Sequence, residues 1–147
     1  MYCRTRAEFL GREVKRRILL GTYVLSSGYY DAYYLRALKA RTLIRRDFDE
    51  VFKRCDALLA PVAPTAAHAA GKGRDNPLEL YLGDIFTATA SLAGICAISV
   101  PCGKTAAGLP VGLQVLGPAF GETAMLRVAA AYEEYATGSI SGREALA

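Results

Sequence analysis

The sequence predicts an α/β fold in which helices are layered on an incomplete mixed β-sheet. Three short apolar runs without polar alternation, at 57–60, 95–100 and 111–116, each adjoin a proline, which is typical of buried strands. Longer amphipathic segments around them predict helices. Three strands make a thin sheet, and two of them look buried on both faces. We therefore expect the chain to be part of a larger sheet.

The composition indicates one globular segment, residues 1–147. Hydrophobic residues make up 52% and charged residues 22% of the 147 positions, which is enough for a real core. The net charge is only +4, and the 18 basic residues are mostly interleaved with the 14 acidic ones. Autonomous binding to RNA or DNA is therefore not favoured.

The cysteine spacing and the residues after Met1 indicate the cellular compartment in which the protein is expected. The four cysteines have no C-x-x-C spacing and the chain has one histidine, which excludes the familiar zinc patterns and favours a reducing, cytoplasmic setting. Met1 is followed by polar residues, not by an apolar signal core. No apolar run approaches the roughly 20 residues of a membrane span. We expect a soluble protein without membrane contact.

Helical periodicity dominates the first third of the chain. Residues 1–12 show no periodic signal and predict an irregular lead-in, as would also be expected where a longer protein has been cut. A first helix is expected over 13–25. A Ser-Ser-Gly interruption follows, in which Ser27 could cap a long helix over 29–54.

The rest of the chain mixes strands, loops and helices. Its first strand is predicted to be central, and the Pro-rich and Ala-rich stretch 61–77 predicts a long loop that is functional or wrapped over the surface. Helical turns are expected over 77–90. Pro101 should end the strand at 95–100, which would form an antiparallel hairpin with 111–116.

The chain should close with an amphipathic helix over 122–135. Its inward face is predicted to consist of Met125, Val128, Ala129 and Tyr132. The polar tail 137–147 should be frayed.

A basic triplet that runs into an apolar segment is the first candidate for chemistry. In 15–17 at least one charged group should meet the edge of buried surface, where a guanidinium needs a carboxylate partner. Arg17 is then either half of a structural ion pair or a clamp for a ligand carboxylate. Asp84, among apolar neighbours, could hold an ammonium group. Together they could recognise a free amino acid, with a plain salt bridge or two unrelated surface charges as the alternatives.

Other catalytic and binding patterns are weak. The only histidine, His68, lies in a predicted loop without a G-x-S-x-G element, so an exposed loop histidine is favoured over a Ser-His-Asp triad. The glycines around Lys72 and Lys104 fit neither a P-loop nor a dinucleotide fingerprint. Cys102 has no neighbouring base in sequence and is interpreted as structural.

Seven stretches, in the same order, resemble the C-terminal part of the A subunit of the glutamyl/aspartyl-tRNA(Gln/Asn) amidotransferases, which belong to the amidase signature family. They are EVKRRILLGTY (13–23), YYDAYY (29–34), RTLI (41–44), PVAPT (61–65), YLGDIFT (81–87), ISVPCG (98–103) and GLPVGLQ (108–114). The resemblance covers about residues 4–135. It implies a large mixed sheet layered between helices, in agreement with the unfinished sheet.

The resemblance also implies a function. The A subunit hydrolyses glutamine and passes the ammonia to a partner subunit, where ATP-activated glutamyl- or aspartyl-tRNA is amidated. The residues that match Arg17 and Asp84 are thought to hold the carboxylate and the amino group of glutamine. The partners implied are the B and C subunits of the amidotransferase, glutamine and, through the complex, misacylated tRNA. ATP and Mg²⁺ would be used in a partner subunit, with no cofactor in this chain.

The chain departs from the family in two respects. Members use a Ser–cis-Ser–Lys triad in an upstream Gly/Ser-rich signature, and Ser26-Ser27 lacks the surrounding glycines and a matching lysine. Cys96 stands where the family usually has proline. The prediction is a segment with the glutamine-binding half of the pocket, no catalytic residue and no activity of its own. A fragment of a general amidase and a non-enzymatic interaction module are the alternatives.

Overall fold

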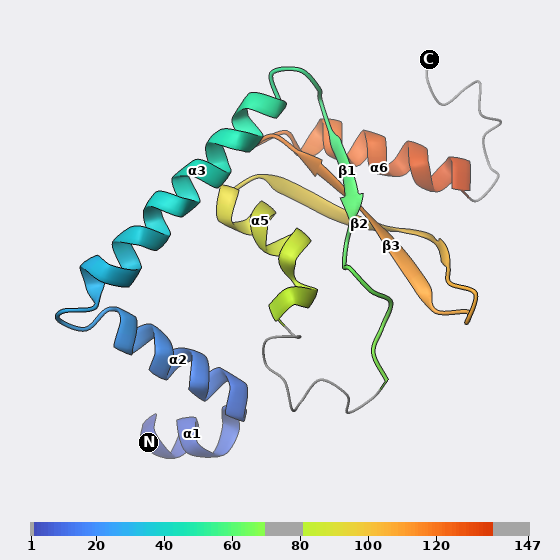
Figure 1. Ribbon diagram of the computed structural model, residues 1–147. Helices are drawn as coiled ribbons and strands as arrows, with labels where there is room; N and C mark the ends of the chain where they lie inside the picture. Colours follow the sequence, from blue (N-terminus) through green and yellow to red (C-terminus); the bar gives the residue numbers. More distant parts are fainter. Residues whose placement is uncertain (1, 70–80, 137–147) are drawn as a thin grey trace. The chain divides into compact units, whose positions relative to one another are not determined.

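The computed structural model describes residues 2–69 and 81–136, which Figure 1 draws in colour. The chain divides into two compact units, Met1–Thr42 and Leu43–Ala147. The predicted frayed tail, the end of the predicted long loop and the start of the predicted helical turns lie outside the described residues. Within the described ranges, no helix combines the length and apolar character that crossing a membrane requires.

The first unit consists of helices. In chain order they are α1 (Tyr2–Phe9), α2 (Arg12–Val24), the π-helical turn η1 (Tyr30–Tyr34) and the first turns of α3 (Leu35–Val51). Tyr23 and Tyr29 contact each other across the turn between α2 and η1, with ring centroids 4.3 Å apart. The structure confirms the predicted helix over 13–25 and most of the one over 29–54.

Two expectations for this unit are wrong. Most of the predicted irregular lead-in at 1–12 is the helix α1. It lacks apolar periodicity, but Arg4 and Glu8 support it with an i,i+4 ion pair of 2.9 Å between Nε and Oε1. Ser27 does not cap the next helix, because Tyr29 occupies the N-cap of η1 and makes no side-chain cap hydrogen bond.

The second unit contains a three-stranded antiparallel sheet. Its elements are β1 (Leu58–Pro61), α5 (Ile85–Ala93), β2 (Cys96–Lys104), β3 (Pro110–Gly117) and α6 (Glu122–Ala136). The strand order is β1-β3-β2, so β3 is the central strand. Figure 1 shows the strands between α5 and α6. The predicted hairpin of 95–100 with 111–116 is confirmed.

The outer strands differ from their predictions. The strand predicted to be central, β1, pairs with β3 alone and is an edge strand of the described sheet. Both β1 and β2 alternate in burial, so neither is buried on both faces. Pro101 does not end β2, which continues to Lys104. The register shifts between Pro101 and Gly103, and such a bulge accommodates a residue without an N–H to donate.

One face of the sheet is covered by α6. The core cluster joins this helix to the two longer strands and consists of Val100, Val115, Met125 and Ala129. Val128 and Tyr132 pack partly buried against the cluster, so the predicted inward face of α6 is confirmed. Burial of a valine or methionine side chain contributes about 1.5–3 kcal/mol, so this cluster stabilises the packing of α6 on the sheet.

The opposite face of the sheet is more polar. Because side chains alternate along a strand, this face carries Ala97, Ser99 and Pro101 of β2 and Gly112, Gln114 and Leu116 of β3. Ser99 lies directly opposite Gln114 in the register. This polar pair lies at the centre of the face that does not meet α6.

Candidate functional site

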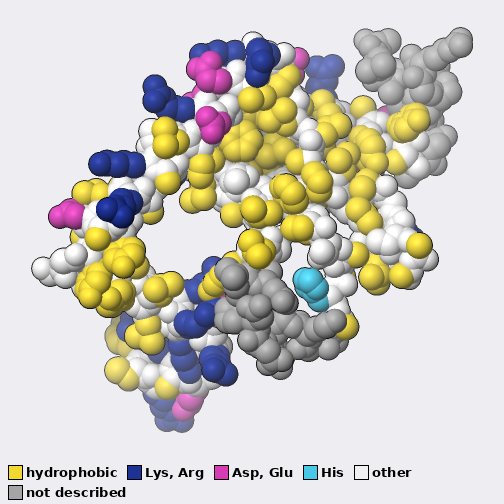
Figure 2. All heavy atoms as spheres, viewed as in Figure 1, with side chains coloured by type: hydrophobic (Ala, Val, Ile, Leu, Met, Phe, Trp, Pro, Cys, Tyr) yellow, Lys and Arg dark blue, Asp and Glu magenta, His cyan; other side chains and the backbone are white. Residues whose placement is uncertain are grey.

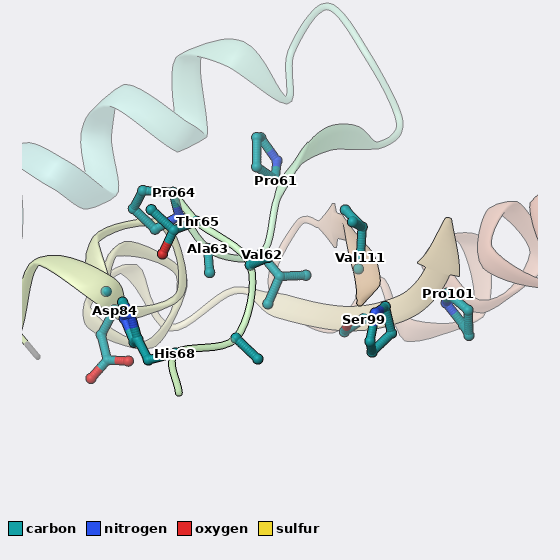
Figure 3. Close-up of a pocket in the computed structure, with 15 residues that line it drawn as sticks. Pro61, Val62, Ala63, Pro64, Thr65, His68, Asp84, Ser99, Pro101 and Val111 are labelled. Atoms are coloured by element: carbon teal, nitrogen blue, oxygen red, sulfur yellow. The ribbon is translucent and has the colours of Figure 1, made fainter. Parts of the chain in front are cut away.

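An open cleft of about 730 Å³ lies in the second unit (Figure 3). Its lining comes from the segment after β1, from the residues just before α5, and from the β2-β3 hairpin. The lining residues are 61–68, 83–84, 99, 101 and 110–112. Part of the predicted long loop, 61–68, therefore forms one wall of the cleft.

Asp84 lies at this cleft, at the N-cap of α5, and its side chain makes no cap hydrogen bond. The side chain is exposed, and most of the other residues that line the cleft are apolar. The backbone carbonyl of Asp84 accepts a hydrogen bond of 2.8 Å from the N–H of Ala88. The N-terminal end of a helix favours negative charge, which suits a carboxylate that binds a cation.

His68 and Ser99 line the same cleft, but they do not build a catalytic triad with Asp84. His68 is exposed, as predicted. Figure 3 shows Asp84 and His68 at one end of the cleft and Ser99 toward the other. Among the described residues, no hydrogen bond between any two of these side chains is found. Cys102 is half-buried in the bulged part of β2.

Arg17 lies in the first unit, on α2. Its Nε donates to Oε1 of Glu13 at 2.9 Å, and Arg16 binds Oε2 of the same carboxylate at 2.8 Å. Lys15 donates to the carbonyl of Ala7 at 2.7 Å. The expectation that one of these charges meets the edge of buried surface is wrong, because both helices lack buried residues and the basic groups use local polar partners.

The Arg17–Glu13 contact is an ion pair between two exposed side chains. The hydrogen bond from Arg17 is the main cause that holds the pKa of Glu13 below its ordinary value of 4.5. Exposed pairs of this kind contribute little to stability, so another carboxylate can replace Glu13 at small cost. The structural ion pair is present, and the role of Arg17 as a ligand clamp stays a prediction.

Arg17 and Asp84 belong to different compact units. Their joint recognition of one ligand therefore also stays a prediction. Within the two described stretches of chain, no group of three or more side chains that could hold a metal ion occurs.

Gln114 is a polar residue that the sequence reasoning missed. It is 4% exposed, and its Oε1 has no hydrogen-bond partner in the described part of the chain. It lines a second cavity of about 320 Å³ beside α5. The signal that could have indicated it is a single polar residue in the middle of the apolar run at 111–116.

Comparison with known proteins gives consistent matches. The amidase family model matches residues 1–126. The A subunit of the glutamyl-tRNA(Gln) amidotransferase of Geotalea daltonii is 59% identical over 134 residues, which cover 91% of this chain and 28% of that relative. The chain thus spans little more than a quarter of that relative's length.

Solved structures agree. The crystal structure of the same kind of subunit from Thermotoga maritima is 43% identical with a TM-score of 0.69, covering 88% of this chain and 29% of the other. A crystal structure described as an amidase is 26% identical with a TM-score of 0.66, covering 86% of this chain and 29% of the other. These likenesses confirm the predicted architecture of an incomplete sheet layered with helices.

Proposed function

Because the chain belongs to the amidase family, as its seven stretches predict, we propose that it supplies the glutamine-binding, C-terminal part of the A subunit of a tRNA-dependent amidotransferase. The observation that carries this proposal is the high identity to the A subunit of Geotalea daltonii along nearly the whole chain. The lower identity to the solved amidase favours this assignment over a general amidase.

In the proposed reaction, glutamine is hydrolysed and its ammonia amidates Glu-tRNA(Gln) or Asp-tRNA(Asn) to Gln-tRNA(Gln) or Asn-tRNA(Asn). The Ser–cis-Ser–Lys triad would be supplied from outside residues 1–147, so no catalytic residue is assigned here. The B and C subunits would be the partners, and ATP and Mg²⁺ would act in one of those partners. The complex would work in the cytoplasm.

Asp84 is proposed to hold the ammonium group of glutamine. Its carboxylate is exposed at the cleft, at the N-terminus of α5. A carboxylate and an ammonium group form a charge-assisted hydrogen bond, roughly twice as strong as a neutral one.

Arg17 is proposed to hold the carboxylate of glutamine. A guanidinium can bind a carboxylate with two parallel hydrogen bonds, and Arg17 already binds one carboxylate, that of Glu13. Glutamine would replace Glu13 at this guanidinium, and the small contribution of an exposed ion pair makes that exchange feasible.

The proposal is tested with a chimera. In the Geotalea daltonii relative, the matching segment is replaced by this chain, the chimera is assembled with the B and C subunits, and ammonia release from glutamine is measured. We expect activity. Loss of a hydrogen bond to a charged group costs about 1.5–3 kcal/mol, so Arg17→Gln and Asp84→Asn should each raise KM for glutamine by roughly 10- to 150-fold.

Two variants serve as matched controls. Arg16→Gln removes the other guanidinium from Glu13, and Asp49→Asn removes an exposed carboxylate on α3, which is not at the cleft. Both should leave KM within about twofold of the parent chimera, since exposed ion pairs contribute little. A folded chimera that releases no ammonia would refute the assignment. Equal hydrolysis of simple amides would favour a general amidase, and equal KM changes in Arg16→Gln and Arg17→Gln would remove the role of Arg17.

A further inference from the structure

The larger cleft has two ionisable side chains among the described residues that line it, those of Asp84 and His68. The other described lining residues are small or apolar, apart from the hydroxyls of Thr65 and Ser99. Figure 3 shows Asp84 and His68 at the same end of the cleft. A cation that enters this end therefore meets one carboxylate and one imidazole.

The backbone is restrained on both sides of this end. The segment that leads to His68 follows β1 and contains Pro61 and Pro64, whose rings fix their φ angles. The carbonyl of Asp84 accepts hydrogen bonds from the N–H of Ala88 at 2.8 Å and from the hydroxyl of Thr87 at 3.2 Å. The two side chains thus reach the cleft from two separate segments, so that both can contact one ligand.

An ammonium group needs more than one acceptor. It has three N–H donors, and a single carboxylate leaves part of them unpaired in a mostly apolar cleft. A neutral imidazole has one nitrogen that accepts and one N–H that donates, whereas a protonated imidazole only donates and carries a positive charge. Neutral His68 can therefore accept a hydrogen bond from an ammonium group, and protonated His68 would repel it.

We propose that His68 shares the ammonium group of the substrate with Asp84, and that binding therefore needs His68 in its neutral form. One N–H of the ammonium group donates to the carboxylate of Asp84, and another donates to a ring nitrogen of His68. Asp84 holds this group in the proposed function, on which the role of His68 rests. The imidazole adds a pH dependence of binding, because histidine is the side chain whose ordinary charge change falls between about pH 5 and pH 8.

The test uses the chimera assembled with the B and C subunits. KM and kcat for ammonia release from glutamine are measured from about pH 8 to about pH 5.5. An ordinary histidine is about one-tenth neutral at pH 5.5, so KM should rise roughly tenfold over this range. His68→Gln keeps a neutral acceptor throughout, and its KM should change less than about twofold. A rise in His68→Gln as large as in the parent chimera would overturn the proposal.

Two further variants separate charge from other changes in the loop. His68→Lys is positively charged over the whole range, so its KM at about pH 8 should already be near the parent value at about pH 5.5. Thr65→Ala is the matched control, because Thr65 lies on the same segment, lines the same cleft and does not titrate in this range. It should keep the pH dependence of the parent chimera. Loss of that dependence, or equal KM values in His68→Lys and His68→Gln, would overturn the proposal.

A ligand without an ammonium group identifies the contact. Glutaric acid monoamide has the carboxylate and the carboxamide of glutamine but no ammonium group, and it is added as a competitive inhibitor of the parent chimera. Its inhibition constant should not rise as the pH falls, because it has no ammonium group for His68 to repel. A rise equal to that of KM would mean that His68 faces another part of the substrate, which would overturn the proposal.

The outcomes also separate the role of His68 from the proposed function. A folded chimera that releases no ammonia at any pH would refute the assignment of the chain, and the role of His68 with it. An active chimera whose KM responds to pH equally with and without His68 would leave the assignment in place and remove the role of His68 alone.

Discussion

The two compact units differ in how far their side chains are buried. In the first unit, α1, α2 and η1 contain no buried residue among those described, and Phe9 and Leu19 are 78% and 70% exposed. In the second unit, Val115 is fully buried within a cluster that joins two strands to α6. Figure 2 shows many hydrophobic side chains at the molecular surface. Both units expose apolar side chains, but among the described residues a buried cluster is found in the second unit, and the helices α1, α2 and η1 of the first bury no residue.

This difference sets what stabilises each unit. Most of the stability of a helix in a protein comes from packing of its apolar face, and isolated short helices are marginal in water. In α1 and α2 the observed support is local, through ion pairs such as Arg4–Glu8 and Arg17–Glu13. Such exposed pairs contribute little to stability. We therefore expect the first unit to open at lower free energy than the second.

The largest effect should come from the core of the second unit. Met125→Ala removes a buried side chain that packs on Val100 and Val115, and it should lower the free energy of unfolding by about 2–5 kcal/mol. The matched control is Leu126→Ala on the same helix, where the side chain is 49% exposed and the expected change is below about 1 kcal/mol. Urea unfolding followed by circular dichroism measures both. Similar losses in the two variants would contradict the assigned core.

Replacing a glycine with alanine should lower the free energy of unfolding in the second unit and raise it in the first. An alanine Cβ at Gly117 would lie 2.9 Å from Sγ of Cys96 and 3.1 Å from Cβ of Met125, so Gly117→Ala should destabilise by about 1–3 kcal/mol. At Gly21, inside α2, a Cβ meets nothing within 4 Å. Gly21→Ala should therefore stabilise that helix by up to about 1 kcal/mol.

The two glycine variants are compared by hydrogen exchange, resolved by residue. Gly117→Ala should speed exchange in β2 and β3, and Gly21→Ala should slow it in α2. Slower exchange in the sheet of Gly117→Ala would mean that the core accommodates the added methyl group. Faster exchange in α2 of Gly21→Ala would mean that this glycine is needed for a contact.

Local patterns in the sequence predicted the helices that have one apolar face and the hairpin formed by neighbouring strands. The helices over 13–25 and 122–135 follow from apolar residues at helical spacing, and the inward face of α6 was identified residue by residue. The hairpin followed from two apolar runs separated by a Gly-rich and Ala-rich turn. Each of these depends on neighbours along the chain.

What failed depends on partners that are distant in sequence. An apolar run cannot reveal how many neighbours a strand has, and β1 lies at the edge of the described sheet. A proline usually interrupts the pairing of a strand because it has no backbone N–H to donate. In β2 the bulge next to Pro101 removes the need for that hydrogen bond, so the strand continues. Gln114 escaped notice because its importance lies in a missing partner, which only coordinates can show. α1 was missed because charge pairing supports it instead of apolar spacing.

The smallest effect concerns the local charges of the first unit. Because the pKa of Glu13 is below 4.5 in the folded chain, its ion pairs stabilise α2 fully above about pH 4.5, and that stabilisation is lost as pH falls through the lower folded value. We expect an NMR titration of the Glu13 carboxyl carbon to give a midpoint below 4.5. Arg17→Gln should raise the midpoint toward 4.5, because the hydrogen bond from Arg17 is the largest cause of the shift.

Arg16→Gln is the matched control for this titration, since Arg16 binds the same carboxylate and is a smaller cause of the shift. It should raise the midpoint less than Arg17→Gln does. Salt should also raise it, because exposed charges are screened. A midpoint unchanged by Arg17→Gln would mean that the pair does not persist in solution. Glutamine would then have no carboxylate to displace from Arg17. The stability of the first unit would then depend even more on the packing of its apolar side chains.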